Sequence, residues 1–178
     1  MSQSNNTDAW EGASYPEQLL DASRRNNTEL LLTIKAELNN DQEVLAKLIN
    51  TTKELITNNS ALHLACLLGN WEFIDIILDI EGVEIDPQNS DGQTPLHLAV
   101  KYTKDEPEHG YFVIDNLLDA GSDPRIKDKL SLQPINYTDD AKLKQLLESA
   151  EYAISMEIPE EEQLSSEEAD AGSASESE

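Results

Sequence analysis

The chain has few of the residues from which catalytic and metal sites are built. Its 178 residues include one cysteine, Cys66, and three histidines, and none of its seven glycines belongs to a phosphate-cradling loop. One cysteine excludes an intrachain disulfide, and a thiol with three scattered histidines makes no metal-ligand set. Because a catalytic site needs several reactive groups at one place, we expect a non-enzymatic protein without cofactor or bound metal.

Positive charge and long apolar runs are also scarce. There are 12 lysines and arginines against 36 aspartates and glutamates, which gives a formal net charge of −24. A field of this sign disfavours direct binding to nucleic acids or membranes and attracts basic proteins, although acidity can also serve solubility alone. We find no segment like a signal peptide and no apolar run near the ~20 residues of a membrane span. We expect a cytoplasmic protein that can also be nuclear.

Composition divides the chain into three zones. Residues 1–14 are rich in serine, asparagine and threonine, residues 15–155 hold nearly all the aliphatic side chains, and residues 156–178 are acidic without lysine or arginine. The last zone cannot bury enough apolar surface to offset the entropy of ordering it. We therefore predict a disordered tail on each side of one folded domain.

The acidic zone contains phosphorylation candidates. Ser165, Ser173 and Ser175 each have a glutamate three positions further on, which is the spacing that suits an acidophilic kinase. Each phosphate would add about −1.5 to −2 charges near neutral pH.

The middle zone contains an internal repeat. Residues 60–65 (SALHLA) and 94–99 (TPLHLA) are offset by 34 residues, and each copy is followed by a helix-like apolar pattern, a glycine and an Asp-Pro turn. Thr94 can cap a helix, and Pro95 suits the first helical position, where it removes no hydrogen bond. The period is that of a turn followed by two antiparallel helices.

The hexapeptide TPLHLA, with Asp91-Gly92 before it, resembles the signature of ankyrin repeats. The resemblance implies an all-α solenoid of about four repeats with β-hairpin-like turns, of which the first and last repeats are degenerate. We predict repeats at about 17–38, 58–90, 91–128 and 129–152, with an extra segment at 39–57 that forms a short helix or a packed loop. About six extra residues fall within 101–111, between the two helices of the third repeat.

The resemblance also implies which residues contact a partner. These are the residues that follow the hexapeptide alanine and the residues at the hairpin tips. The helix positions are Arg24, Arg25, Leu67, Leu68, Lys101 and Tyr102, with Trp71 added as a possible anchor, and the tip positions are Gln88, Ser90, Asp91, Gln93, Lys127, Lys129, Leu130 and Leu132.

Several of these side chains have a structural alternative. Leu67 and Leu68 could be buried against residues 39–57, Trp71 could pack on its own helix, and Lys127 and Lys129 could be solvated charges. The resemblance gives His63 and His97 a structural hydrogen-bonding role between neighbouring loops. For the remaining groups we expect a packed thiol at Cys66 and a solvated ring at His109.

The combination of few repeats, an irregular segment before the second repeat and an acidic C-terminal zone resembles small acidic fungal ankyrin-repeat proteins. One member of that group is a dedicated chaperone for a newly made ribosomal protein. The resemblance implies a monomeric protein-binding module, either an escort for a basic client or a regulatory or scaffold adaptor for another protein.

Overall fold

Helices make up the regular structure of residues 12–157, which are the residues that this computed structural model describes. The phosphorylation candidates Ser165, Ser173 and Ser175 and most of both predicted tails lie outside this range. No helix in the described range is both long enough and apolar enough to span a bilayer. The elements are α1 (Tyr15–Arg25), α2 (Thr28–Glu37), α3 (Gln42–Thr51), α4 (Ala61–Leu68), α5 (Trp71–Leu78), α6 (Pro95–Tyr102), α7 (Pro107–Asp119), the 3₁₀ turn η1 (Pro134–Tyr137) and α8 (Ala141–Glu157).

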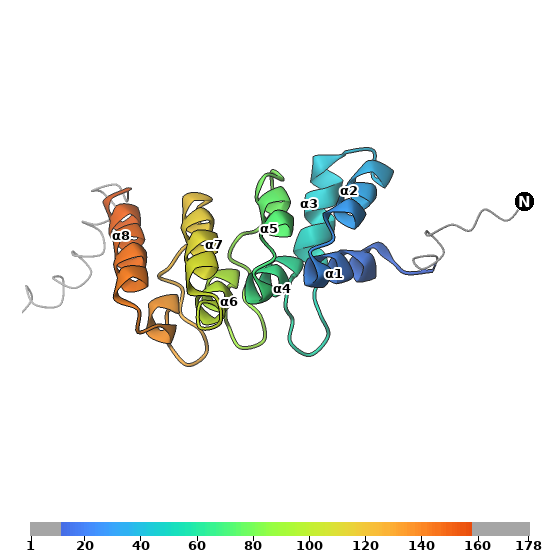
Figure 1. The fold of residues 1–178 in the computed structure, drawn as a ribbon. Coiled ribbons are helices and arrows are strands. Elements are labelled where there is room, and N and C mark those ends of the chain that lie inside the picture. The colour runs from blue at the N-terminus through green and yellow to red at the C-terminus, as the bar shows by residue number, and fades with distance from the viewer. Residues whose placement is uncertain (1–11, 158–178) are drawn as a thin grey trace, which may run out of the picture.

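The helices stack in two rows (Figure 1). Helices α1, α4 and α6 contact one another in sequence and form the first row, and each pairs with α2, α5 or α7 of the second row. Three loops project from the side of the first row. We call residues 53–59, 86–93 and 125–132 the first, second and third fingers.

Local signals define the helices of the two regular repeats. The hydroxyls of Ser60 and Thr94 accept hydrogen bonds from the third helical N–H group, and Pro95 occupies the first turn of α6. Helix α4 ends at Gly69, whose φ of 67° is left-handed and therefore favours glycine. The capped starts that the repeat predicted are therefore present in both copies.

One apolar core runs through the whole stack. Its fully buried members come from every repeat, because each helix buries one stripe against the next pair. Cys66 is buried in this core, as expected, and burial strongly raises the pKa of its thiol. The largest fully buried side chains include Leu19, Leu31, Leu62, Phe73, Ile74, Leu96, Ile114 and Leu147.

Two buried histidines connect neighbouring repeats. The ring Nδ1 of His63 accepts the backbone N–H of Ser60 at 3.0 Å, so Nε2 carries the proton and donates to the carbonyl of Gln93 at 2.8 Å. His97 donates in the same way to the carbonyl of Leu132 at 3.0 Å. Each ring thus joins the start of a helix to the base of the following finger, which is the structural role that the family resemblance implied.

The fingers are close in shape to hairpins, but residues 12–157 contain no β-strand. Single backbone hydrogen bonds close the second and third fingers, from Asn89 N to Gln93 O and from Asp128 N to Leu132 O. Gly92 has a φ of 74°, and a Cβ on it would lie 2.9 Å from the backbone nitrogen of Lys129. A glycine is therefore required there both for the turn and for the approach of the third finger.

The first and last repeats are irregular in different ways. Helices α1 and α2 form a helix pair, and the extra segment adds α3, as predicted. The fourth repeat has the single 3₁₀ turn η1 in place of its first helix, because only six residues lie between Pro134 and the start of α8. The fourth repeat is therefore degenerate, as the family resemblance implied. Helix α8 starts at Ala141 and continues to Glu157, beyond the predicted end of the fourth repeat at about residue 152.

Replacing Leu96 by alanine should lower the free energy of unfolding by roughly 2–5 kcal/mol, because a fully buried leucine leaves a cavity. Urea unfolding followed by circular dichroism measures the loss. Leu130→Ala is the control, since this leucine is 75% exposed and its loss should change stability by less than about 0.5 kcal/mol. A loss below about 1 kcal/mol for Leu96→Ala would contradict the assigned core position.

The buried histidines should make the domain less stable in mild acid. Burial lowers the pKa of His63 from 6.5 to about 4, so between these values only the unfolded chain binds the proton. The contribution is complete above pH 6.5 and is lost as the pH falls towards 4. We expect His63 to remove about 2 kcal/mol of unfolding free energy between pH 7 and pH 5.

The measurement is urea unfolding at both pH values for the wild type and for His63→Gln, whose side chain cannot titrate. The variant should be less stable at pH 7 and should show a smaller loss between the two pH values. An equal pH dependence in the two proteins would mean that His63 is not held neutral by the fold.

Candidate partner-binding site

The predicted contact residues fall into two groups in space. One group lies on the fingers and the other where α4 and α6 end and α5 and α7 begin. Helices α4 and α6 separate the groups, and each is eight residues or about 12 Å long. The sequence predicted both groups from the same repeat. In the structure they lie at opposite ends of α4 and α6.

Hydrogen bonds between neighbouring fingers hold the finger group in register. Ser90 N donates to the carbonyl of Thr57 at 2.8 Å, and Lys129 N donates to the carbonyl of Asp91 at 2.9 Å. The Ser90 hydroxyl also donates to the carbonyl of Ile56 at 2.6 Å. A partner would therefore meet one continuous edge that is already ordered, which reduces the entropy lost on binding.

Some of the predicted tip residues are used inside the fingers. Gln88 donates from its amide to the carbonyls of Gly92 and Lys127, and Gln93 is buried. The prediction that Gln93 is a surface contact was wrong, because its side-chain amide faces Asp128 in the third finger. The exposed members of the finger group are Gln88, Ser90, Asp91, Lys127, Lys129 and Leu130.

The third finger is held by a carboxylate at its base. One oxygen of Asp128 accepts the backbone N–H groups of Leu130 and Leu132 at 2.9 and 3.0 Å, and the other accepts the Tyr137 hydroxyl. Burial alone would raise the pKa of Asp128, but these hydrogen bonds and one from Gln93 lower the pKa to about 2. Leu130, 75% exposed, is presented on this fixed turn.

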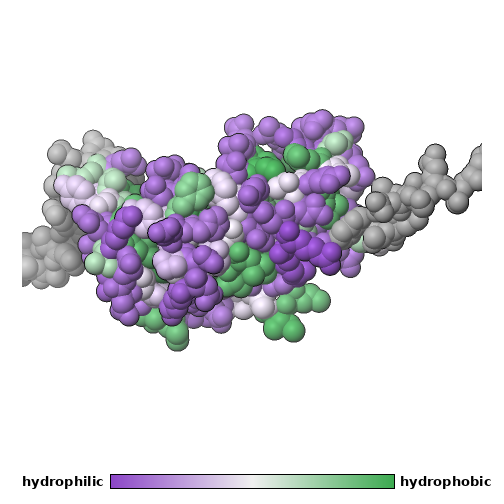
Figure 2. All heavy atoms as spheres, viewed as in Figure 1, coloured by the Kyte–Doolittle hydropathy of each residue, from purple (hydrophilic) through white to green (hydrophobic). Residues whose placement is uncertain are grey.

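The first finger carries two exposed apolar residues that our sequence analysis assigned to a helix or packed loop. Leu55 and Ile56 are 90% and 97% exposed. Figure 2 shows hydrophobic surface at the tips of the projecting loops, along the lower edge of the molecule. The sequence contains a signal for this exposed position, because the 34-residue offset of the repeats aligns Ile56 with the tip residue Ser90. The first and third fingers therefore present apolar side chains at their tips.

The second group is an aromatic cluster between the second and third repeats. Trp71 and Tyr102 were predicted as contacts, and the structure adds His109 and Phe112 from α7. We call these four residues the helix-end cluster. The prediction of a solvated His109 was wrong, because its ring stacks with Phe112 and its Nε2 lies 2.7 Å from the carbonyl oxygen of Gly69.

Leu67 and Leu68 form the last turn of α4, beside Gly69 and the helix-end cluster. They are 40% and 47% exposed, so the alternative that residues 39–57 bury them is wrong. The apolar surface at this end of the repeats therefore extends from α4 to α7.

The three predicted basic contacts on the helices, Arg24, Arg25 and Lys101, are already paired within the domain. Arg24 bonds to Glu54 at 2.6 Å, and Arg25 lies 3.2 Å from Asp21. Lys101 donates to the amide oxygen of Gln93 at 2.9 Å, and its nitrogen lies over the Tyr137 ring. A partner that engaged these cations would have to replace these contacts.

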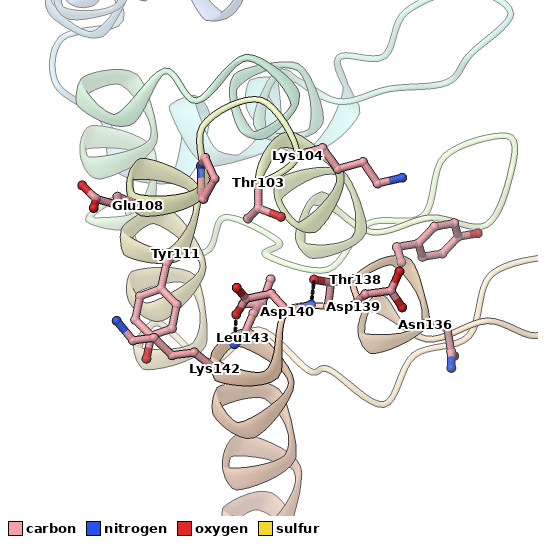
Figure 3. A pocket seen from close by; sticks show the side chains of 12 residues that line it. Thr103, Lys104, Glu108, Tyr111, Asn136, Thr138, Asp139, Asp140, Lys142 and Leu143 are labelled. Atoms are coloured by element: carbon pink, nitrogen blue, oxygen red, sulfur yellow. Dashed lines mark hydrogen bonds between the residues drawn. The ribbon is translucent and has the colours of Figure 1, made fainter.

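A cleft of about 580 Å³ lies between α7 and the fourth repeat (Figure 3). It is found where η1 replaces a complete first helix. Several polar groups at its wall serve local structure: Asp140 caps α8 through the Leu143 N–H at 2.8 Å, and Lys142 lies 4.3 Å from the centre of the Tyr111 ring. No nucleophile paired with a base is found among its lining residues.

The described part of the chain offers no place for a metal ion. Within residues 12–157, no three histidine, cysteine, aspartate or glutamate side chains come together in a suitable group. The chemistry that the surface offers is contact: apolar finger tips, the helix-end cluster and many carboxylates.

Ile56 has a φ of 73°, which strains a β-branched residue. Replacing it by asparagine, which tolerates this conformation, should raise the free energy of unfolding by about 1 kcal/mol. Leu55→Asn is the control because Leu55 is equally exposed but does not have a positive φ. Urea midpoints measure both, and equal shifts in the two variants would show that the backbone at Ile56 stores no strain.

Three comparisons with known proteins agree with this architecture. The family model for ankyrin repeats matches three copies over residues 19–133. The chain is 51% identical to the ankyrin repeat-containing protein YGL242C of Saccharomyces cerevisiae over 149 aligned residues. The alignment covers 81% of this chain and 82% of that protein. Among solved structures, a chain in the crystal structure of the yeast ribosomal protein Rps3 in complex with its chaperone Yar1 has the same fold. It has a TM-score of 0.57 and 24% identity, over 78% of this chain and 89% of that chain. The chain therefore belongs to the ankyrin-repeat family.

Proposed function

We propose that this protein is a non-enzymatic escort that binds a basic client protein in the cytoplasm or nucleus. The observation that carries the proposal is the charge of the central repeats. Residues 55–100, which include α4, α5 and the second finger, contain no lysine or arginine. They contain the carboxylates of Glu72, Asp75, Asp79, Glu81, Glu84, Asp86 and Asp91.

The apolar finger tips supply contacts that add affinity to the attraction between charges. Charge complementarity mainly accelerates association and excludes wrong partners, whereas buried apolar side chains supply most of the affinity. Leu55, Ile56 and Leu130 are held exposed on ordered turns. An acidic surface with ordered apolar projections suits a client that is basic and still has uncovered apolar surface.

The structural neighbour adds limited support. Yar1 is the chaperone of the ribosomal protein Rps3, and at 24% identity the likeness to that structure concerns the fold alone. It indicates that an ankyrin-repeat protein of this size can serve as a dedicated escort.

The client should be sought with the full chain. Tagged protein is incubated with a ribosome-depleted cell extract, and the captured proteins are identified by mass spectrometry. The proposal expects a strongly basic protein that is kept soluble and free of RNA by the escort. A neutral or acidic partner, with binding insensitive to salt, would favour the regulatory or scaffold adaptor.

Removing residues 158–178 should slow association with the client and flatten its salt dependence. The deletion leaves α8 complete and removes eight carboxylates, so the net charge falls from −24 to −16. The attraction of these charges is screened by salt within about 10 Å at 0.1 M. Phosphorylation of Ser165, Ser173 and Ser175 should act in the opposite direction.

The measurement is the association rate with the purified client at two salt concentrations. Deletion of residues 1–11, which removes only Asp8 and Glu11, is the control. The contrary outcome is that the two deletion variants associate at the same rate at both salt concentrations and protect the client equally. In that case the proposal that residues 158–178 attract the client by their charge is wrong.

A further inference from the structure

The helix-end cluster is a contact surface that the fingers do not explain. The rings of Trp71 and Phe112 meet edge to face with centroids 4.8 Å apart, and Phe112 stacks with His109 at 6.2 Å. Tyr102 meets His109 at 5.9 Å. Four rings from α5, α6 and α7 thus lie together at the end of the repeats away from the fingers.

The insertion in the third repeat builds this cluster. Helix α7 has 13 residues where α5 has eight, and the additional first turn, residues 107–110, places His109 on the carbonyl of Gly69. A Cβ on Gly110 would lie 3.0 Å from the Cα of Thr103, so only glycine allows this turn to approach α6 so closely. The six extra residues therefore bring aromatic rings together at one edge of the repeats.

A second glycine seats the Tyr102 ring. A Cβ on Gly69 would lie 2.2 Å from Cζ of Tyr102, so the ring rests directly on the C-terminal turn of α4. This places Tyr102 next to Leu67 and Leu68, which are two-fifths exposed or more. Phe112 is 45% exposed. The cluster is ordered by its own contacts and still offers apolar surface to a partner.

Carboxylates surround the cluster. Burial raises the pKa of the Tyr102 hydroxyl, and the charges of Glu106 and Asp105 raise it further. On the other side, Glu72 accepts a hydrogen bond from Asn26 at 2.7 Å. Hydrogen bonds lower the pKa of Glu72, and the nearby His109 lowers it further. Carboxylates are therefore neighbours of both Tyr102 and His109.

The two lysines closest to Tyr102 in sequence are directed elsewhere. Lys101 is held by Gln93 of the second finger, and Lys104 lines the cleft against the fourth repeat. Figure 3 shows Lys104 and Glu108 on opposite sides of that cleft, with Glu108 on the outer side of α7. The carboxylates beside the rings are therefore left without a lysine partner among these neighbours.

We propose that the helix-end cluster is a docking surface for a basic amphipathic helix of the client. A large apolar side chain of that helix packs on Phe112 and Trp71, and flanking lysines or arginines face Glu72, Asp105 and Glu106. Aromatic side chains are preferred binding anchors, and a cation near an aromatic face gains further stabilisation. The basic character of the helix rests on the proposed escort function. A second copy of this chain would bring two acidic rims together, which charge repulsion opposes.

The test uses two synthetic 18-residue helical peptides. One carries leucine on one face and lysine on the other, and the second has glutamine in place of every leucine. The full chain is used as Trp10→Phe, so that Trp71 is the only tryptophan and its fluorescence reports binding. In that background, Phe112→Ala should weaken binding of the leucine peptide about tenfold, a loss typical of an interface anchor.

Leu32→Ala in the same background is the matched control, because Leu32 is 48% exposed on α2, outside both the fingers and the helix-end cluster. It should leave binding of the leucine peptide unchanged. Glu106→Gln should weaken binding at low salt and have less effect at high salt. Circular dichroism of each variant checks that the helix content is kept.

Three results would overturn the inference. They are equal binding of the two peptides, equal effects of Phe112→Ala and Leu32→Ala, and a dimer that Phe112→Ala converts to a monomer in light scattering. The escort proposal fails separately. If the full chain captures no basic protein but the peptide test succeeds, the cluster binds basic helices and the client assignment is wrong. If a basic client is captured and Phe112→Ala binds it normally, the escort stands and this surface is not used.

Discussion

The hydrogen bond from a buried histidine to the next finger is the contact on which the remaining geometry depends. His63 and His97 each accept a backbone N–H at the start of their own helix and donate to a carbonyl in the following repeat. A neutral ring is needed for both bonds at once, and burial keeps it neutral by lowering its pKa. These hydrogen bonds consequently fix both the spacing between repeats and the direction of the fingers.

Because the fingers are fixed in this way, their tips can carry unusual residues. Ile56 adopts a left-handed conformation and remains fully exposed, and Leu130 extends from a turn that Asp128 organises. Neither residue contributes to the core. Their placement costs stability or solubility without a structural return, which is typical of residues kept for binding.

The irregular segments, rather than the regular repeats, give the protein its particular surfaces. The extra turn of α7 assembles the helix-end cluster, and the missing helix of the fourth repeat leaves the cleft beside η1. The regular repeats supply a rigid support and a surface with few cations. A common fold thus acquires individual contact sites at the positions where it departs from its own period.

The sequence alone determined the fold class, the capped helix starts and the buried faces, because hexapeptide spacing, capping residues and apolar periodicity are local signals. It also placed a short helix or a packed loop at residues 39–57, where α3 lies. Tertiary structure decided what the irregular residues do. His109 was expected in solvent and lies on Gly69, forty residues away, because an added helical turn and two glycines bring the chains together. Leu55 and Ile56 were expected to pack and instead project. Such outcomes depend on which segments meet in space, and no local pattern encodes that.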